Sequence, residues 1–252
     1  MMQKTLHLAL ATAIASILSL TAFSTPTQAF TFNAANDFST TDNPNNPWQY
    51  GWSWTLGGNF NLSTNSTHLT PTLDLWIDQE THPHLSVYHG AIFHNSTEEV
   101  NNSHSTITLQ PNQLALHPGY RGEYSILRWT APETKTYSLS SVFSGLDHVG
   151  PTTTDVHVLH NGTLLFSDLV NGFGVTSSKS FSATQTIEAG DTIDFAVGYG
   201  TNQNYWFDST GIDATISANE SEKVPEPSIL SSLALLSLLG LGTTISRKHK
   251  SH

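Results

Sequence analysis

The chain of 252 residues contains no cysteine. This absence excludes disulfide bonds, thiolate nucleophiles and thiolate metal ligands, so side-chain burial and backbone hydrogen bonds must hold the fold together. Basic residues are also scarce: nine Lys and Arg stand against twenty Asp and Glu, which gives a formal net charge of −11. Because a nucleic-acid partner needs Lys and Arg to neutralise its phosphates, the composition argues against DNA and RNA.

Helical periodicity is hard to find between residues 30 and 217, and the common catalytic signatures are missing too. The sequence has no Gly-x-Ser-x-Gly elbow, no His-Glu-x-x-His pattern and no Gly-rich phosphate-binding loop. Glu123, Asp147 and Glu188 are acids that a glycoside hydrolase could use, but a catalytic carboxylate pair is defined by its separation in space, which a sequence does not supply. The sequence therefore predicts a non-catalytic protein.

Residues 30–219 instead show short runs of alternating apolar and polar residues, bounded by Gly, Pro, Asn and Asp. The clearest signal is a hairpin, in which Asn161-Gly162 supplies the positive φ angles of a two-residue turn between 155–160 and 163–169. Further strands are expected at 73–77, 85–93, 105–110, 122–130, 136–143, 181–188, 193–199 and 212–217. Residues 33–65 are expected to form a long loop or an outer hairpin. The pattern predicts an all-β fold, a single antiparallel, jelly-roll-like β-sandwich domain.

Residues 1–29 have the pattern of a secretory signal peptide. Lys4 precedes a mostly apolar stretch at 8–20, and Thr27-Gln28-Ala29 provides small residues at a cleavage site. We therefore expect export of the chain and removal of this segment, with an uncleaved anchor as the alternative.

A second apolar segment lies at residues 229–245. It carries no charge, and as a helix it would span roughly 25 Å, slightly less than the ~30 Å hydrocarbon core of a bilayer. Arg247, Lys248 and Lys250 follow it as a basic stop that should stay in the cytoplasm. Residues 229–252 are therefore predicted to be a transmembrane helix with a basic tail, which holds the exported precursor at the inner membrane.

Pro225-Glu226-Pro227 lies in the linker, residues 220–228, that joins the domain to this apolar segment. With the segment and Arg247-Lys248, the motif resembles the C-terminal sorting signal of the PEP-CTERM proteins of Gram-negative bacteria, including cyanobacteria. The resemblance implies processing near Pro-Glu-Pro by exosortase, a membrane-embedded Cys/His transpeptidase-like enzyme, and a link to exopolysaccharide and biofilm matrix. The basic end here is Arg-Lys-His-Lys rather than an Arg-rich cluster. An ordinary tail anchor behind a proline-containing linker is the alternative.

The body of the chain resembles a β-sandwich module that recurs in exported bacterial proteins. The likeness rests on residues 116–132, 155–158 and 208–213. It implies the fold, but no activity.

Two aromatic clusters are candidates for carbohydrate binding. Aromatic rings stack against the apolar faces of sugars, while neighbouring amide side chains meet the hydroxyls. Because alternate residues of a strand share a face, the four aromatic residues of the first cluster would form one row. For this row, packing in the core is the alternative. The clusters are Trp48, Tyr50, Trp52 and Trp54, and Tyr205-Trp206 beside the Asn and Gln residues at 202–204.

Acids and histidines suggest cation sites. Asp155 and His157 are two positions apart on a predicted strand, so both would face one side, where a carboxylate and an imidazole can hold a metal. The alternative is that the plentiful histidines occupy exposed positions on sheet edges and loops. A structural calcium ion is a further candidate, although Asp near turns also serves turn formation. Its candidate ligands are Asp191, Asp194, Asp208 and Asp213.

Taken together, the sequence predicts an exported, non-catalytic protein of the cell envelope or extracellular matrix, which is sorted by its C-terminal signal and binds exopolysaccharide. An envelope polysaccharide hydrolase or lyase is the alternative, and a purely structural spacer is a third reading.

Overall fold

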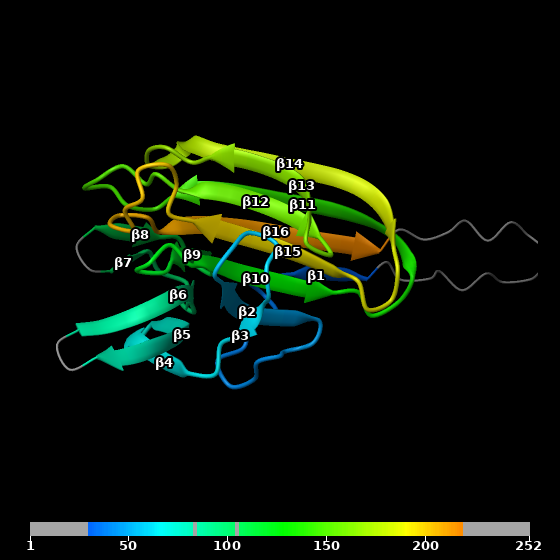
Figure 1. Ribbon diagram of the computed structural model, residues 1–252, viewed down its shortest axis with the longest axis horizontal. Helices are drawn as coiled ribbons and strands as arrows, with labels where there is room; N and C mark the ends of the chain where they lie inside the picture. Colours follow the sequence, from blue (N-terminus) through cyan, green and yellow to red (C-terminus); the bar gives the residue numbers. More distant parts are fainter. Residues whose placement is uncertain (1–29, 83–84, 104–105, 219–252) are drawn as a thin grey trace, which may run out of the picture.

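The computed structural model describes residues 30–82, 85–103 and 106–218 (Figure 1). Within these ranges the regular structure is sixteen β-strands, and every pairing between them is antiparallel. The predicted all-β, antiparallel class is confirmed. No helix in the described part is long and apolar enough to cross a bilayer. The predicted signal peptide, the Pro225-Glu226-Pro227 motif and the predicted C-terminal helix lie outside the described residues.

Two sheets form a sandwich. The first contains β1 (Thr31–Asn33), β4 (Ser66–Thr70), β5 (Leu73–His82), β6 (Leu85–Asn95), β9 (Leu114–Pro118), β11 (Lys135–Gly145), β14 (Gly174–Ile187) and β16 (Thr210–Ala218). Its order is β14-β11-β16-β9-β6-β5-β4, and β1 also pairs with β16.

The second sheet has the order β13-β12-β15-β10-β2-β3. It contains β2 (Trp48–Ser53), β3 (Asn61–Leu62), β10 (Tyr124–Thr130), β12 (Asp155–His160), β13 (Thr163–Leu169) and β15 (Thr192–Gly198). A small hairpin of β7 (Asn101–Ser103) and β8 (Ile107–Leu109) stands beside the sandwich. From β9 to β16 the chain passes repeatedly from one sheet to the other, which is the kind of connection that jelly rolls use.

The main core lies between the sheets, because alternate side chains of each strand face the opposite sheet. In β10, Leu127 and Trp129 belong to this core and are fully buried. Arg128, between them, faces outward and forms a two-pronged ion pair with Asp194 of β15 (Nε to Oδ1 2.6 Å, Nη2 to Oδ2 2.8 Å). Residues 122–130 are expected to form a strand, and β10 shows the alternation of buried and outward-facing side chains that a strand in a sandwich has.

Two hairpins agree with the sequence. β12 and β13 pair directly, and the turn residues Asn161 and Gly162 have φ angles of 48° and 75°. Residues 33–65 contain β2 and β3, which pair through Gly51 and Leu62 at the edge of the second sheet. The interval therefore contains both predicted features: residues 34–47 form a long loop between β1 and β2, and β2 and β3 form the outer hairpin.

A second, smaller core lies on the outer face of the first sheet. β5 and β6 carry buried apolar side chains on both faces: Trp76 and Ile92 point into the main core, whereas the apolar residues on either side of them point outward. The β7–β8 hairpin and Leu146 cover part of this outer face. The outward-facing members of the cluster from β5, β6 and β9 are Leu73, Leu75, Ile77, Ala91, Phe93 and Ala115.

Candidate functional site

Three loops meet at one end of the sandwich, which we call the loop end. They are residues 119–123, 146–154 and 199–209, and the registers that pair Gly145 with Thr210 and Asp155 with Gly198 place the last two together. The described chain starts and ends at the opposite end, where the backbone N–H of Ala218 donates to the carbonyl of Phe30 at 2.8 Å. Figure 1 shows the loop end on the left and both described chain ends on the right.

A cavity of about 630 Å³ opens beside the loop end, on the outer face of the first sheet. Its volume falls in the range of small-molecule binding sites. The floor is apolar because it is built from the outward-facing residues of β5 and β6 together with one residue of β8. These are Leu73, Leu75, Ile77, Ala91, Phe93 and Ile107.

A β-bulge in β6 brings Tyr88 to this cavity. Ile77 pairs with Ala91 and Gln79 pairs with Tyr88, so two residues of β6 lie opposite one residue of β5. Without the extra residue, strand alternation would put Tyr88 and Ala91 on opposite faces, but with it both line the cavity. Gly90, within the bulge, has a φ of 149°, which residues with a side chain rarely adopt.

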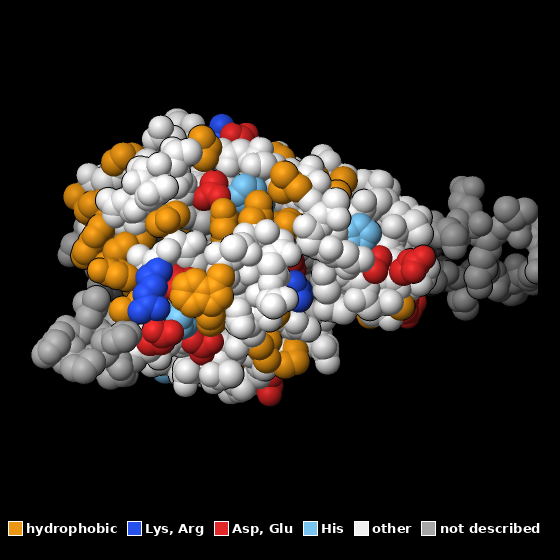
Figure 2. Space-filling model, viewed as in Figure 1, with side chains coloured by type: hydrophobic (Ala, Val, Ile, Leu, Met, Phe, Trp, Pro, Cys, Tyr) orange, Lys and Arg blue, Asp and Glu red, His pale blue; other side chains and the backbone are white. Residues whose placement is uncertain are grey.

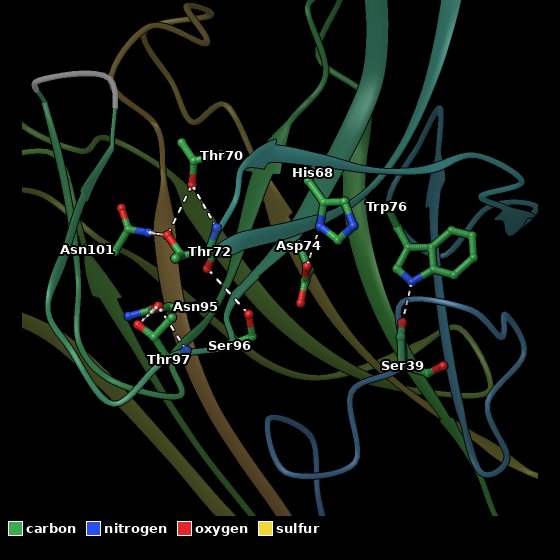
Figure 3. A network of polar contacts seen from close by, with 10 residues as sticks. All are labelled: Ser39, His68, Thr70, Thr72, Asp74, Trp76, Asn95, Ser96, Thr97 and Asn101. Carbon is green, nitrogen blue, oxygen red and sulfur yellow. Dashed lines mark hydrogen bonds and ion pairs between the residues drawn. The ribbon is translucent and has the colours of Figure 1, made fainter.

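Polar contacts fix the outer wall of the cavity (Figure 3). His68 Nδ1 lies 2.7 Å from Asp74 Oδ1, which ties the edge strand β4 to β5. Asn101 Nδ2 donates to Thr72 Oγ1 at 2.9 Å, which ties the turn between β4 and β5 to β7. The edge strand β4 is thus held to β5 by side-chain contacts as well as by the backbone hydrogen bonds of the sheet.

An aromatic lip, defined as Tyr120, Tyr205 and Trp206, stands at the loop end beside the cavity. The ring centroid of Tyr205 lies 4.9 Å from Trp206, 5.0 Å from Tyr120 and 5.9 Å from Tyr88. Trp206 is 61% exposed and Tyr120 is 40% exposed, while Tyr205 and Trp206 also line the cavity. In the view of Figure 2, hydrophobic side chains gather on the left, at the loop end.

The 199–209 loop, which carries Tyr205 and Trp206 of the aromatic lip, is anchored to the sandwich. The backbone N–H of Gly200 donates to Asp155 Oδ1 at 2.7 Å, and Asn202 Nδ2 donates to Thr153 Oγ1 at 2.6 Å. Within the loop, the N–H of Trp206 donates to Asn204 Oδ1 at 3.0 Å. Side-chain bonds of this kind stabilise turns, so the lip is presented on a loop with a defined conformation.

The cavity carries little charge. Among the described residues that line it there is no Lys or Arg, and Asp147 is the one acid. Burial raises the pKa of Tyr88 and lowers the pKa of His117, so both side chains are neutral at neutral pH. The backbone N–H of Ser209 donates to Asp147 Oδ2 at 2.9 Å. The buried Oγ of Ser209, in contrast, has no hydrogen-bond partner among the described residues.

A second aromatic group, the Trp54 cluster, comprises Trp52, Trp54 and His89 and lies between β2 and β6. The indole of Trp52 stacks on His89 at 4.0 Å, and Trp54 packs edge-on against both with 51% of its surface exposed. His89 is flanked by carboxylates: Nδ1 lies 3.0 Å from Glu123 Oε1, and Nε2 lies 3.2 Å from Glu80 Oε1. The imidazole of His89 can donate to the two carboxylates at once only when each of its ring nitrogens carries a proton.

The structure divides the predicted row of four aromatic residues. Trp48 and Tyr50 are fully buried in the main core, and Trp48 Nε1 donates to Asp37 Oδ2 at 3.1 Å. Core packing, the alternative reading, therefore applies to these two residues. Trp52 is half-buried, and its Nε1 is engaged by Asp78 Oδ2 at 3.1 Å. Of the four, Trp54 alone presents a largely exposed ring.

Asp155 and His157 do face the same side of β12, as expected. The two side chains contact each other, so neither is free to bind a metal in this arrangement. His157 Nε2 lies 2.8 Å from Asp155 Oδ2, and the same oxygen accepts a hydrogen bond from the hydroxyl of Tyr124 at 2.9 Å. Burial acts to raise the pKa of Asp155, but these contacts and the Gly200 N–H outweigh it and hold the pKa below its usual value. Like His89, His157 is buried, so the expectation of exposed histidines does not hold for them.

The four proposed calcium ligands do not converge on one point. Asp191 accepts from Asn161, and Asp194 is paired with Arg128. Asp208 is fully buried at the loop end, while Asp213 is exposed on β16. Among the described residues, no group of three or more His, Asp or Glu side chains is placed to hold a metal.

Sequence reasoning identified Tyr205 and Trp206 but missed Tyr88, Tyr120 and His117. A usable signal exists for the floor, because Leu73, Leu75 and Ile77 form an apolar row on one face of β5 while the large apolar Trp76 lies on the other. No comparable signal exists for Tyr88, since its position depends on the bulge.

No family model matches the chain, and no curated protein matches it. Among solved structures, it is similar to a family 35 carbohydrate-binding module from Clostridium thermocellum, at 12% identity over 61% of this chain and 98% of that one, with a TM-score of 0.25. It is also similar to CBM51 from Clostridium perfringens GH95, solved in complex with methyl-galactose, at 13% identity over 50% of this chain and 86% of that one, with a TM-score of 0.32. TM-scores this low carry no argument about what the chain binds.

Proposed function

We propose that this protein is an exported, non-catalytic, polysaccharide-binding protein of the cell envelope or extracellular matrix. The observation that carries the proposal is the aromatic lip, where the rings of Tyr120, Tyr205 and Trp206 are partly exposed beside a cavity of ligand size. Exposed aromatic rings beside a cavity are suited to stacking against the apolar face of a sugar ring. The exposed amide side chains at 202–204 supply donors and acceptors for its hydroxyls.

The carboxylates support a binding rather than a hydrolytic role. Glu123 is fully buried and bonded to His89 and to the backbone N–H of Arg121. Asp147 is buried against Ser209. Glu188 follows β14 at the opposite end of the sandwich, since Ile187 pairs with Lys135 at the start of β11. The three acids named by the sequence therefore do not flank one open site.

Delivery to the cell exterior is the second part of the proposal. It is supported by the signal-like residues 1–29 and by the sorting-like segment from Pro225 to the basic residues after 245. Because Ala218 lies at the end opposite the loop end, attachment through the C-terminal segment would direct the aromatic lip away from the membrane. Weak sugar contacts then gain strength when many copies are displayed together.

Glycan-array binding combined with site-directed variants tests the binding role. Trp206→Ala is expected to weaken retention of the bound polysaccharide about tenfold, which corresponds to roughly 1.4 kcal/mol. Phe30→Ala, which removes another exposed aromatic ring at the opposite end, should leave retention unchanged, and Trp54→Ala reports whether the Trp54 cluster takes part. Release of reducing ends would instead support a hydrolase, and neither binding nor turnover would support a structural spacer.

The sorting role has a separate test. When Pro225-Glu226-Pro227 is replaced by three alanines in a host that contains exosortase, the full-length precursor should accumulate in the inner membrane. The unaltered chain should appear as a shorter product in the envelope or medium, as detected by an antibody against the body. Identical processing of both chains would contradict the sorting proposal and leave the binding proposal standing.

A further inference from the structure

The floor of the cavity is chemically unlike a site for a bare sugar. Its side chains are aliphatic or aromatic hydrocarbon, and several retain a small exposed fraction of 4–9%. A sugar hydroxyl placed against them would lose its water without gaining a partner, which opposes binding. An apolar group in the same place would instead be driven in by burial of its surface. The partly exposed floor residues are Leu75, Ile77, Ala91, Phe93 and Ile107.

The charge of the cavity lining disfavours anionic substituents on a sugar. No Lys or Arg lies among the described residues that line the cavity, and the one acid, Asp147, is buried. A sulfate, phosphate or carboxylate on a sugar would therefore meet a carboxylate and no compensating cation. The cavity favours a neutral group.

One polar group in the wall remains available. Ser209 is 1% exposed, lines the cavity and has an Oγ with no hydrogen-bond partner among the described residues. Two neighbouring polar groups in the wall are engaged: the hydroxyl of Tyr88 lies 3.3 Å from His117 Nδ1, and Asp147 Oδ2 accepts from the Ser209 N–H. A buried hydroxyl without a partner is costly, and the carbonyl oxygen of a ligand would satisfy it.

We infer that the cavity accepts a short O-acyl group of the polysaccharide, with the acyl carbons against the apolar floor and the ester carbonyl accepting a hydrogen bond from Ser209 Oγ. The inference rests on the proposed function and makes it narrower: the aromatic lip stacks on the sugar ring, and the cavity selects acylated over unacylated chains. Tyr205 belongs to both parts, since it lies in the lip and also lines the cavity.

Paired glycans test this selection. The protein as exported by its host is titrated with naturally O-acetylated glucomannan and xylan, each before and after mild alkali, which removes the acyl groups and leaves the polysaccharide chain. Methyl tetra-O-acetyl-β-D-glucopyranoside and methyl β-D-glucopyranoside serve as the small-molecule pair. We expect at least a tenfold preference for the acylated member of a pair.

Variants locate the selection in the cavity. Ala91→Leu, which fills the floor, should reduce the preference to about onefold, and Ser209→Ala should reduce it severalfold. Ser141→Ala is the matched control, because Ser141 is also 1% exposed with an unpartnered Oγ, but it lies on β11 and does not line the cavity. The control should keep the full preference. Thermal unfolding of each variant separates loss of selection from loss of fold.

The outcomes distinguish this inference from the proposed function. Equal binding of acylated and de-acylated glycans, with Trp206→Ala still weakening both, overturns the acyl site and leaves polysaccharide binding intact. A preference that persists in Ala91→Leu also overturns the acyl site. Absence of binding to every glycan and to both small probes overturns both proposals.

Discussion

Asp208 illustrates how one buried acid can couple the stability of this fold to pH. Its Oδ1 accepts from the backbone N–H and the hydroxyl of Thr153, at 2.9 and 3.1 Å, but Oδ2 has no partner among the described residues. Burial raises the pKa of this carboxyl to about 7, although the bonds from Thr153 act in the opposite direction. The folded protein therefore favours the neutral acid.

The free energy of unfolding should therefore depend on pH. The pKa is about 7 in the folded chain and about 4 in the unfolded chain, so the folded state binds the proton more tightly, and the free energy of unfolding falls as the pH rises between these values. Asp208→Asn removes the buried charge and should stabilise the protein at pH 8 by an amount on the order of 2 kcal/mol, with little effect at pH 4. Urea unfolding at both pH values measures this, and the exposed Asp213→Asn is the control. A stability difference that does not change with pH would contradict the assignment.

Two tryptophans of the predicted clusters should behave in opposite ways. Trp48 is fully buried and Trp206 is 61% exposed. Trp48→Ala should lower the free energy of unfolding by about 3–5 kcal/mol because it leaves a cavity in the core, whereas Trp206→Ala should stay within about 0.5 kcal/mol of the parent protein. Urea unfolding separates the two. If Trp206→Ala proved as costly as Trp48→Ala, the lip would be part of the core and not a surface for ligands.

At the scale of elements, local signals were sufficient for some features and not for others. The β12–β13 hairpin could be predicted because Asn161-Gly162 fixes its turn within two residues. Which of the four aromatic residues at 48–54 are buried could not be predicted. Strand alternation shows which residues share a face, but not where the covering sheet ends. Trp48 and Tyr50 lie under that cover, while Trp54 comes after β2 has ended at Ser53.

The assembly of the cavity could not be predicted from the sequence either, although the apolar row of β5 indicated part of its floor. Its floor joins β5, β6 and β8, and its lip comes from the connections after β9 and β15. These segments meet only through pairings between residues far apart in the chain, such as Ala91 with His117 and Leu116 with Thr210. The periodicity of each strand contains no information about which strand becomes its neighbour.

The 199–209 loop gives a prediction at the same scale. Asp155 joins this loop to β10 and β12, since it accepts from Gly200 N–H, from the hydroxyl of Tyr124 and from His157. Asp155→Ala should cost about 1–3 kcal/mol, because it leaves these groups unpaired. It should also speed amide hydrogen exchange at 199–209 more than elsewhere.

Asp168→Ala is the matched control for this loop, because Asp168 also accepts hydrogen bonds but lies on β13, outside the loop, with 42% of its side chain exposed. Exchange rates in the loop should not change in the control. Faster exchange spread evenly over the whole domain in Asp155→Ala would indicate global destabilisation and would contradict a specific anchoring role.

At the scale of the whole molecule, the two ends of the sandwich differ in what they hold. Antiparallel registers carry the chain from Tyr137, opposite Ala218, to Gly145, opposite Thr210. The described chain therefore begins and ends at one end and presents its aromatic lip at the other (Figure 1). The proposed function as a displayed binding domain requires this polarity, because attachment at one end would not obstruct a ligand at the other.

The absence of cysteine allows a direct test of this polarity, since a single introduced thiol becomes the only attachment point. Glu188→Cys lies at the end of the described termini and Thr201→Cys lies in the loop that carries the lip, and both positions are exposed. Coupled to a surface through these thiols, the Glu188→Cys protein should capture polysaccharide and the Thr201→Cys protein should not, because the surface covers its lip. Binding by both proteins in solution, before coupling, controls for the substitutions themselves. Equal capture in both orientations would mean that the ligand binds away from the loop end, and the aromatic lip would then no longer be the site.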